Sequence, residues 1–217
     1  ARAAFAGYSQ TSVDERVALL ERIIAEYKKR YDDVAAAITE EMGAPVSLAK
    51  QAQAAMGIGH LKTALEVLKD YAFQEQRGTT MLVKEPIGVC GFITPWNWPI
   101  NQIACKVVPA LAVGCTMVLK PSEIAPFSAQ VWTEILDAAG VPAGVLNVVF
   151  GGGADAAGSH LVEMMDEGRL DKFAFTGSTK VGRQIGEIAG RNLLHPTLEL
   201  GGKNPLIVMR DADLDNA

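Results

Sequence analysis

Three polar side chains in this sequence stand among apolar or rigid neighbours, where a polar group could take part in chemistry. Asn97 lies between two tryptophans and two prolines, so its amide could donate to a developing oxyanion or could only complete the turn. Glu199 lies between two leucines and precedes two glycines; it could be a half-buried general base with a raised pKa, or the exposed carboxylate of an edge strand. Lys106 interrupts an apolar segment, so we expect its ammonium to face a polar cavity or a carboxylate.

A lysine and a glutamate follow the apolar run 115–119, at Lys120 and Glu123. A carboxylate at the turn after a buried strand can accept hydrogen bonds from ribose hydroxyls. The alternative is an exposed ion pair that contributes little to stability. The residues alone leave both interpretations open.

Two glycine-containing turns could bind phosphate. Residues 176–182, Thr-Gly-Ser-Thr-Lys-Val-Gly, join a predicted strand to a predicted helix and combine free backbone amides with hydroxyls, which favours phosphate contact. Ser178 could equally be a plain helix N-cap. Residues 151–158 are also rich in glycine but lack the G-x-G-x-x-G spacing, so they could form a tight turn or contact a ligand.

The segments that connect these residues predict an α/β fold. Five apolar runs read as buried strands and are separated mostly by helical segments, which predicts a doubly wound, mostly parallel five-stranded sheet; the runs are 87–93, 115–119, 145–150, 171–175 and 196–200. A further strand is expected at 204–209. Ligands bind beyond the carboxyl ends of such strands, which is where Asn97 and Lys120 fall.

A layer of helices is expected before the sheet. Ser12 and Glu15 form a capping-box pattern, and three amphipathic helical regions follow, the last two at 31–42 and 46–73. We expect these helices to pack the core without carrying chemistry. Residues 79–84 have strand composition and need a partner strand from this chain or from another subunit, which hints at oligomerisation.

Composition narrows the class of protein. The net charge of −5 argues against a nucleic-acid partner, and no apolar run reaches the roughly 18 residues of a membrane span. Cys90, Cys105 and Cys115 lie in apolar segments without metal-ligand spacing, so we interpret them as core thiols and expect neither a metal site nor disulfides. These features favour a soluble protein of the reducing cytoplasm.

Four motifs in order closely resemble the cofactor-binding, N-terminal portion of the aldehyde dehydrogenase family. They are Thr-Pro-Trp-Asn-Trp-Pro at 94–99, Leu-Lys-Pro-Ser-Glu at 119–123, Phe-Thr-Gly-Ser-Thr-x-Val-Gly at 175–182, and Leu-Glu-Leu-Gly-Gly-Lys at 198–203. The resemblance covers nearly the whole chain. It implies a Rossmann-like sheet and an NAD(P)-dependent oxidation of an aldehyde to a carboxylic acid.

The same resemblance implies catalytic roles. In this family a cysteine thiolate attacks the aldehyde, and the resulting oxyanion is held by an amide at the position of Asn97. Hydride transfer to the nicotinamide leaves a thioester, and the carboxylate at Glu199 activates the water that hydrolyses it. Lys106 matches a family lysine near that glutamate, in its proton relay.

The resemblance also implies which residues line the cofactor. Lys120 and Glu123 would hold the adenosine ribose, and Ser178 the pyrophosphate. A carboxylate at position 123 repels a ribose 2′-phosphate, so NAD is expected over NADP, although Lys120 could weaken that preference. The full set is Ile93, Thr94, Pro95, Trp96, Asn97, Lys120, Ser122, Glu123, Gly153, Phe175, Gly177, Ser178, Val181, Glu199, Leu200 and Gly201.

One part of the family pattern is missing. Only 18 residues follow Glu199 and none is a cysteine, so the nucleophile is expected beyond this chain. We expect a helical part at 1–77, a strand of an oligomerisation segment at 78–86, an NAD-binding core at 87–200 and the start of a catalytic domain at 201–217. The complete protein would be a homodimer or homotetramer that acts on a small aldehyde; if 217 residues are the true product, a nucleotide-binding or scaffold module is the alternative.

Overall fold

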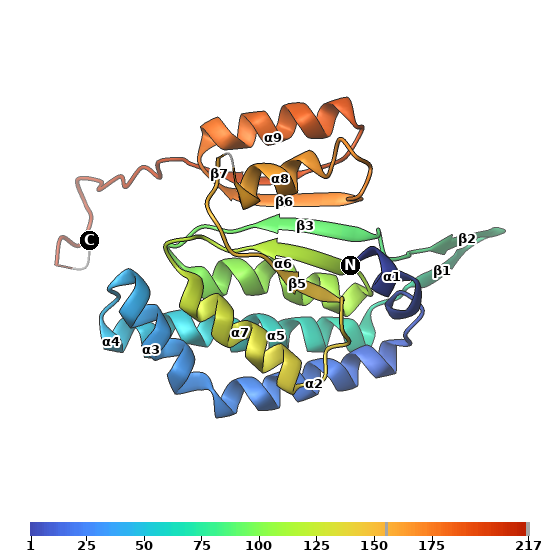
Figure 1. The fold of residues 1–217 in the computed structure, drawn as a ribbon. Coiled ribbons are helices and arrows are strands. Elements are labelled where there is room, and N and C mark those ends of the chain that lie inside the picture. Colours follow the sequence, from blue (N-terminus) through green and yellow to red (C-terminus); the bar gives the residue numbers. More distant parts are fainter. Residues whose placement is uncertain (155, 216–217) are drawn as a thin grey trace.

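A computed structural model describes residues 1–154 and 156–215 as a layered α/β fold (Figure 1). Its centre is a parallel sheet of five strands in the order β5-β4-β3-β6-β7. The strands are β3 (Val89–Ile93), β4 (Thr116–Lys120), β5 (Leu146–Val148), β6 (Lys172–Gly177) and β7 (Thr197–Leu200). The predicted doubly wound, five-stranded sheet is confirmed.

The strand order reverses between β3 and β6. The chain builds outward from β3 to β4 and β5, and then returns to place β6 on the other side of β3. At the carboxyl end of the sheet, Ile93 lies in register with Lys120 on one side and with Phe175 on the other. Such a reversal opens a crevice outside the strand ends, where ligands of doubly wound sheets bind.

Helices cover both faces of the sheet (Figure 1). One face carries α8 (Ala157–Glu163) and α9 (Thr179–Arg191). The other carries α6 (Pro99–Val113), which starts with a proline at its first turn and ends at Gly114 with φ +90°, together with α7 (Pro126–Ala138). Because α6 is made almost wholly of apolar residues, it is buried between the sheet and an outer helical layer.

The outer layer contains the predicted helices. They are α2 (Val13–Lys29), α3 (Tyr31–Met42), α4 (Val46–Leu48), a π-helical turn (Ala49–Gln53) and α5 (Ala54–Asp70), preceded by the short α1 (Arg2–Tyr8). The capping box is confirmed: the Ser12 hydroxyl accepts from the Glu15 amide at 3.2 Å, and the Glu15 carboxylate accepts from the Ser12 amide at 2.7 Å. The sequence analysis did not predict α1, and the third helical region ends at Asp70, before position 73.

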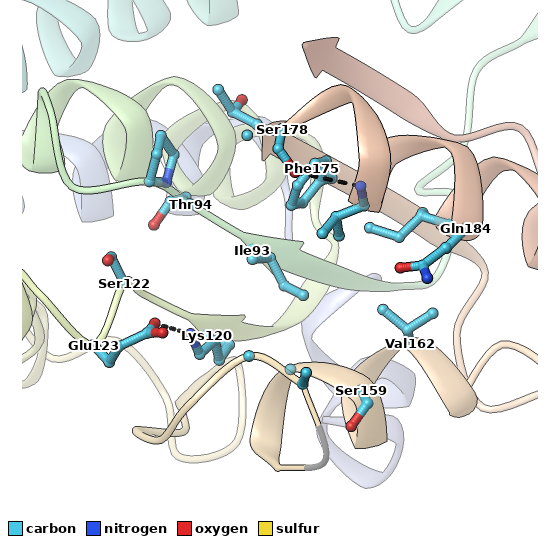
Figure 2. Close-up of a pocket in the computed structure, with 18 of the residues that line it drawn as sticks. Ile93, Thr94, Lys120, Ser122, Glu123, Ser159, Val162, Phe175, Ser178 and Gln184 are labelled. Atoms are coloured by element: carbon cyan, nitrogen blue, oxygen red, sulfur yellow. Dashed lines mark hydrogen bonds and ion pairs between the residues drawn. The ribbon is translucent and has the colours of Figure 1, made fainter. Parts of the chain in front are cut away.

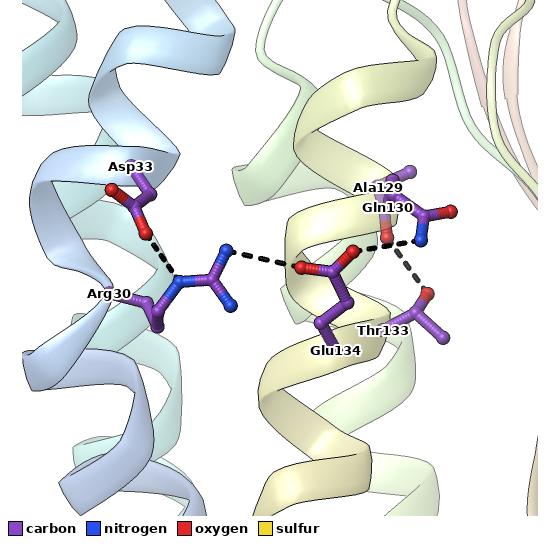
Figure 3. Close-up of polar contacts among 6 residues, drawn as sticks. All are labelled: Arg30, Asp33, Ala129, Gln130, Thr133 and Glu134. Carbon is purple, nitrogen blue, oxygen red and sulfur yellow. Dashed lines mark hydrogen bonds and ion pairs between the residues drawn. The ribbon is translucent and has the colours of Figure 1, made fainter.

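A polar network ties this layer to α7 (Figure 3). Arg30, between α2 and α3, pairs with Asp33 and also reaches Glu134 of α7 at 3.1 Å. Glu134 in turn accepts from Gln130 at 2.9 Å. These side chains are partly exposed, so the network orients the helices while buried apolar packing supplies most of the stabilisation.

The predicted strand near 79–84 forms half of a hairpin. β1 (Gln74–Arg77) and β2 (Thr80–Val83) pair antiparallel and project from the body of the molecule (Figure 1). The partner strand therefore comes from this chain, and residues 74–77 are a strand, although we expected them in the helical part. A composition of Gln-Glu-Gln-Arg gives no strand signal, so only the pairing with β2 explains β1.

The strand predicted at 204–209 is wrong. Residues 201–209 have no helix or strand in the described structure, and Leu206 and Ile207 are 82% and 74% exposed. A strand needs a neighbour for its backbone hydrogen bonds, and no strand of the described residues pairs with this segment. No helix among the residues that the structure describes is long and apolar enough to cross a membrane.

Candidate functional site

Two adjoining cavities lie at the carboxyl edge of the sheet. The larger has a volume of about 750 Å³ and the smaller about 460 Å³. Four residues form parts of both walls: Pro95, Trp96, Thr176 and Gly177. A ligand could therefore extend from one cavity into the other.

Every residue expected to line the cofactor lies on one of these walls. The larger cavity contains Ile93, Thr94, Pro95, Trp96, Lys120, Ser122, Glu123, Gly153, Phe175, Gly177, Ser178 and Val181. The smaller contains Asn97, Glu199, Leu200 and Gly201. The fold thus brings together residues from the ends of β3, β4, β6 and β7 and from the turn after β5. These residues are up to 108 positions apart in the chain, from Ile93 to Gly201, and their contact with a cofactor stays a prediction.

An ion pair with a buried cation forms one end of the larger cavity. The Lys120 ammonium lies 2.7 Å from the Glu123 carboxylate, with its own side chain 3% exposed and that of Glu123 51% exposed (Figure 2). The hydrogen bond from Lys120 holds the pKa of Glu123 below its ordinary value. The pair differs from an ordinary exposed ion pair because its cation is buried, which keeps Glu123 charged at the cavity mouth.

The beginning of α9 lies on the opposite side of this cavity (Figure 2). Ser178 is the N-cap, since its hydroxyl accepts from the Val181 amide at 3.3 Å. The N-cap interpretation is therefore confirmed, and the hydroxyl hydrogen stays available to donate. A Cβ at Gly177 would lie 2.5 Å from the Phe175 ring, so glycine allows the backbone to pass close to this aromatic side chain.

The glycine-rich turn 151–158 borders the same cavity through Gly153 and Gly158. A Cβ on Gly158 would lie 2.7 Å from the Gly153 carbonyl oxygen, so the start of α8 packs directly on the turn. Asp155, part of the motif, lies outside the described residues. The tight-turn interpretation is confirmed, and Gly153 also reaches the cavity wall.

The far wall of the larger cavity was not predicted. It is formed by α8 and α9, through Ser159, Val162, Gln184, Ile185, Ile188 and Arg191. Figure 2 shows Val162 and Gln184 approaching each other from these two helices. The signal in the sequence was the helical spacing of Val181, Ile185 and Ile188, which places apolar side chains on one face.

The two polar side chains expected to take part in catalysis, Asn97 and Glu199, both line the smaller cavity. Asn97 precedes α6, and Glu199 is on β7. Both residues are exposed, and neither side chain has a hydrogen-bond partner in the described part of the chain. The half-buried alternative for Glu199 is wrong, because β7 is the edge strand of the sheet. Gln102, which the sequence analysis missed, lies on the same wall.

Lys106 does not line this cavity but contacts Thr176, which does. Its ammonium donates to the Thr176 hydroxyl at 2.8 Å, and Thr176 lines both cavities. Burial lowers the pKa of Lys106, while Cys105 and the Glu199 carboxylate act in the opposite direction. The lysine thus faces a hydroxyl, with the carboxylate close enough to influence its charge.

The three cysteines differ in their surroundings. Cys90 and Cys115 are buried, as expected of core thiols. Cys105 is half-buried; its thiol donates to the Gln102 carbonyl at 3.3 Å and lies 3.8 Å from the Lys106 ammonium. The core interpretation is therefore confirmed for two of the three thiols and is wrong for Cys105, since its helix face is only partly covered.

Comparison with known proteins identifies the family of this chain. The model of the aldehyde dehydrogenase family matches residues 1–217. The chain is 53% identical to 3-succinoylsemialdehyde-pyridine dehydrogenase from a Pseudomonas species, over 100% of this chain and 45% of that protein. It therefore spans less than half the length of this curated relative.

Solved structures give the same result. An aldehyde dehydrogenase from Bartonella henselae has a TM-score of 0.93 at 46% identity, covering 99% of this chain and 45% of that one. A mutant of aldehyde dehydrogenase C from Pseudomonas syringae, in complex with NAD+ and octanal, has a TM-score of 0.94 at 43% identity over 100% of this chain and 44% of that one. The chain belongs to the aldehyde dehydrogenase family.

Proposed function

We propose that the protein oxidises an aldehyde to a carboxylic acid and passes the hydride to NAD. One observation carries the proposal: the two cavities share a wall, and the residues suited to a nucleotide line the larger cavity while those suited to acyl chemistry line the smaller one. Glu123 and Ser178 belong to the larger cavity. Asn97 and Glu199 belong to the smaller one.

The larger cavity has the side chains that a dinucleotide requires. Glu123 is charged and can accept from ribose hydroxyls, and the free hydroxyl hydrogen of Ser178 lies at the positive end of α9, where a pyrophosphate binds well. Ile93 and Phe175 add an apolar floor. When bound there, NAD supplies the acceptor for the hydride. The like charge of Glu123 disfavours a 2′-phosphate, which supports NAD over NADP.

The smaller cavity has the groups for the acyl steps. The Asn97 amide is unpaired in the described structure and can donate to an oxyanion. The Glu199 carboxylate can take a proton from the water that attacks a thioester. As an ammonium, Lys106 would stabilise the Glu199 carboxylate; its lowered pKa favours loss of a proton, and the neutral amine would then take up the proton of Glu199 by way of the Thr176 hydroxyl.

The nucleophile is assigned to a cysteine outside these residues. None of the three thiols lies on the described walls of the smaller cavity, and the curated relative is more than twice as long as this chain. Residues 87–200 would then form the NAD-binding core, and the segment from 201 would begin the catalytic domain; its last two residues, 216 and 217, lie outside the described structure. The free thiols agree with a reducing cytoplasm.

The projecting hairpin is proposed as a subunit contact of a homodimer or homotetramer. Met81 and Val83 of β2 are 52% and 54% exposed, and an exposed strand edge is suited to pairing with another chain. Sedimentation of the full-length protein tests this. A monomer at micromolar concentration would contradict it.

A substitution of Glu199 tests the proposed function. In the full-length protein, Glu199→Gln should leave a rapid first turnover of NADH formation and slow the steady rate, because only hydrolysis of the acyl-enzyme needs the base. General-base catalysis contributes typically about 100- to 10,000-fold. Glu66→Gln, an exposed residue of α5 that lines neither cavity, is the matched control. A slowed first turnover with an unchanged later rate would overturn the assignment of Glu199.

A further inference from the structure

Two buried thiols lie side by side on the face of the sheet that α6 covers. Cys90 on β3 is in register with Met117 on β4, and Cys115 stands two residues before Met117, so both cysteine side chains point to the same face. The Cys90 thiol donates a hydrogen bond to the Cys115 sulfur. The two sulfur atoms are therefore in contact, and the acyl chemistry proposed for the smaller cavity uses neither of them.

The Cys115 sulfur is surrounded by hydrogen-bond donors. Besides the Cys90 thiol, the backbone amides of Gly88 and Ile87 donate to it. These hydrogen bonds favour the thiolate and lower the pKa of Cys115, although burial and the Asp171 carboxylate act in the opposite direction. The thiolate is the nucleophilic form of a cysteine, so the surroundings prepare this sulfur for reaction.

A buried cation beside this thiol lacks a carboxylate partner. Arg16 of α2 is 6% exposed, and its Nε has no hydrogen-bond partner among the described residues. A Cβ on Gly114 would lie 2.6 Å from Nη1 of Arg16, so the guanidinium lies against the residue that precedes Cys115. Burying a charge is costly unless an opposite charge accompanies it. A Cys115 thiolate would supply that charge.

The other acidic groups that influence Arg16 are already engaged. They are Tyr8 and Glu15. Burial raises the pKa of Tyr8, and its hydroxyl donates to a backbone carbonyl of α6 at 3.0 Å, so this group is neutral. The Glu15 carboxylate accepts from the amide and the hydroxyl of Ser12 at 2.7 and 2.8 Å. Cys115 is the remaining group of the three that can serve as the counter-ion.

We infer that Cys115 and Cys90 form a reactive thiol pair that a hydroperoxide oxidises to a reversible disulfide. In the first step the Cys115 sulfur attacks a peroxide oxygen; the S–O bond forms, the O–O bond breaks, and the proton lost by Cys115 leaves with the alcohol or water. In the second step the Cys90 sulfur attacks the sulfenic acid; the S–S bond forms, the S–O bond breaks, and hydroxide leaves as water with the proton of Cys90. The thiols lose two electrons in total and the hydroperoxide gains them.

The position of the pair restricts which oxidants reach it. Cys115 and Cys90 are 2% and 3% exposed, whereas Ile87, whose amide donates to Cys115, is 57% exposed. A small hydroperoxide can enter when this segment opens locally, and a bulky electrophile cannot. The pair lies at the amino ends of β3 and β4, away from the cavities at their carboxyl ends, so the inference does not depend on the proposed function.

Peptide mapping of the full-length protein after treatment with hydrogen peroxide tests the inference. Trypsin leaves Cys90 in residues 85–106 and Cys115 in residues 107–169. We expect a disulfide that joins Cys90 to Cys115 and that dithiothreitol reverses. Cys105 is the comparison within the same protein: it is half-buried, so exposure alone would make it react first. We expect the Cys115 thiol to be lost at least about tenfold faster than that of Cys105.

Substitutions locate the reaction. Cys115→Ser should leave Cys90 reduced, whereas Cys90→Ser should leave Cys115 as a sulfenic acid that dimedone traps once the protein is unfolded. At pH 6.5, Arg16→Met should slow the loss of the Cys115 thiol about tenfold, as a rise of one unit in its pKa would. Arg16→Lys keeps the charge and should slow it less. Lys28→Met, on the exposed side of α2, is the control.

Three results would overturn the inference and leave the proposed function intact. They are faster loss of the Cys105 thiol than of the Cys115 thiol, no disulfide between Cys90 and Cys115, and equal oxidation rates in Arg16→Met and Arg16→Lys. If Arg16→Met does not fold, the pH dependence of the wild type replaces it. The rate of loss of the Cys115 thiol should reach half its plateau below about pH 8.5, the ordinary pKa of a free thiol; a midpoint at or above that value would contradict the inference.

Discussion

At the scale of single residues, Glu123 is the side chain that we propose to face a ribose in the larger cavity. Lys120 is buried and holds this carboxylate in its charged form, with part of the carboxylate facing the cavity mouth. The pair thus offers a strong acceptor for hydroxyls and a repulsive charge for a phosphate. The sequence gives the two residue types, but only the fold shows that the lysine is buried.

Glu123→Gln should weaken NAD binding and reduce discrimination against NADP. A hydrogen bond to a charged group contributes about 1.5–3 kcal/mol, so Kd for NAD should rise about tenfold or more, while Kd for NADP should rise less or fall. Calorimetry of the full-length protein with both nucleotides measures this, with Glu134→Gln on α7 as the control. Equal losses for NAD and NADP would show that Glu123 does not face the ribose.

The lowered pKa of Lys106 predicts how the free energy of unfolding changes with pH. Burial lowers its pKa in the folded chain, so between that lowered pKa and the ordinary value of 10.5 the unfolded chain binds more protons than the folded chain. Its contribution to the free energy of unfolding therefore increases as pH rises through this window. Lys106→Met should remove that increase.

Urea unfolding of the wild type and Lys106→Met over a series of pH values isolates the effect of the lysine. Burial raises the pKa of Tyr8 and of Tyr27, and this effect on stability is the same in both proteins and cancels in the difference. A difference between the two proteins that is constant up to pH 10.5 would contradict a lowered pKa.

At the scale of elements, one carboxylate links two helices. Glu41, at the end of α3, accepts from the amides of Phe127 and Ser128 in the first turn of α7 at 2.6 and 3.1 Å. It therefore caps α7 from a neighbouring helix, since the N-cap Ala125 has no side chain that can accept. This contact fixes α3 of the outer layer against α7.

Glu41→Ala should lower the free energy of unfolding by about 1 kcal/mol, the usual cost of a lost cap. Burial raises the pKa of Glu41, so the folded chain holds its proton more tightly than the unfolded chain does. The contribution from this titration is full below pH 4.5 and is lost as pH rises through the raised pKa. Glu41→Gln, which keeps an acceptor, should abolish this pH dependence and destabilise less than alanine; equal effects of both variants at every pH would contradict the cap.

Elements with a clear local signal in the sequence were predictable, and elements without such a signal were not. The capping box at Ser12 located the start of α2, and the apolar run 87–93 located β3, which begins two residues later at Val89. α1 lacks a side-chain cap, and β1 is wholly polar, so neither has a local signal. For the site, motifs identified Asn97 and Lys120, but Gln102 belongs to no motif and enters only because α6 turns it toward the cavity.

At the scale of the whole molecule, the reversal of strand order creates the site. β3 and its neighbours β4 and β6 end at the same level, and Ile93, Lys120 and Phe175 lie side by side there. β7 then continues the edge and brings Glu199 near Asn97. The parallel sheet was predictable from its apolar runs, whereas the residues left both a half-buried and an exposed Glu199 open, because the outcome depends on β7 being at the edge.

We propose that a hydride passes from the aldehyde carbon in the smaller cavity to a nicotinamide that reaches it from the larger one. The most direct measurement uses the full-length protein, NAD and an aldehyde with deuterium on its carbonyl carbon, followed by mass spectrometry of the NADH. We predict that each NADH formed carries one deuterium and that one carboxylic acid forms with it. NADH without deuterium, or no NADH with any aldehyde while the nucleotide binds, would contradict the account.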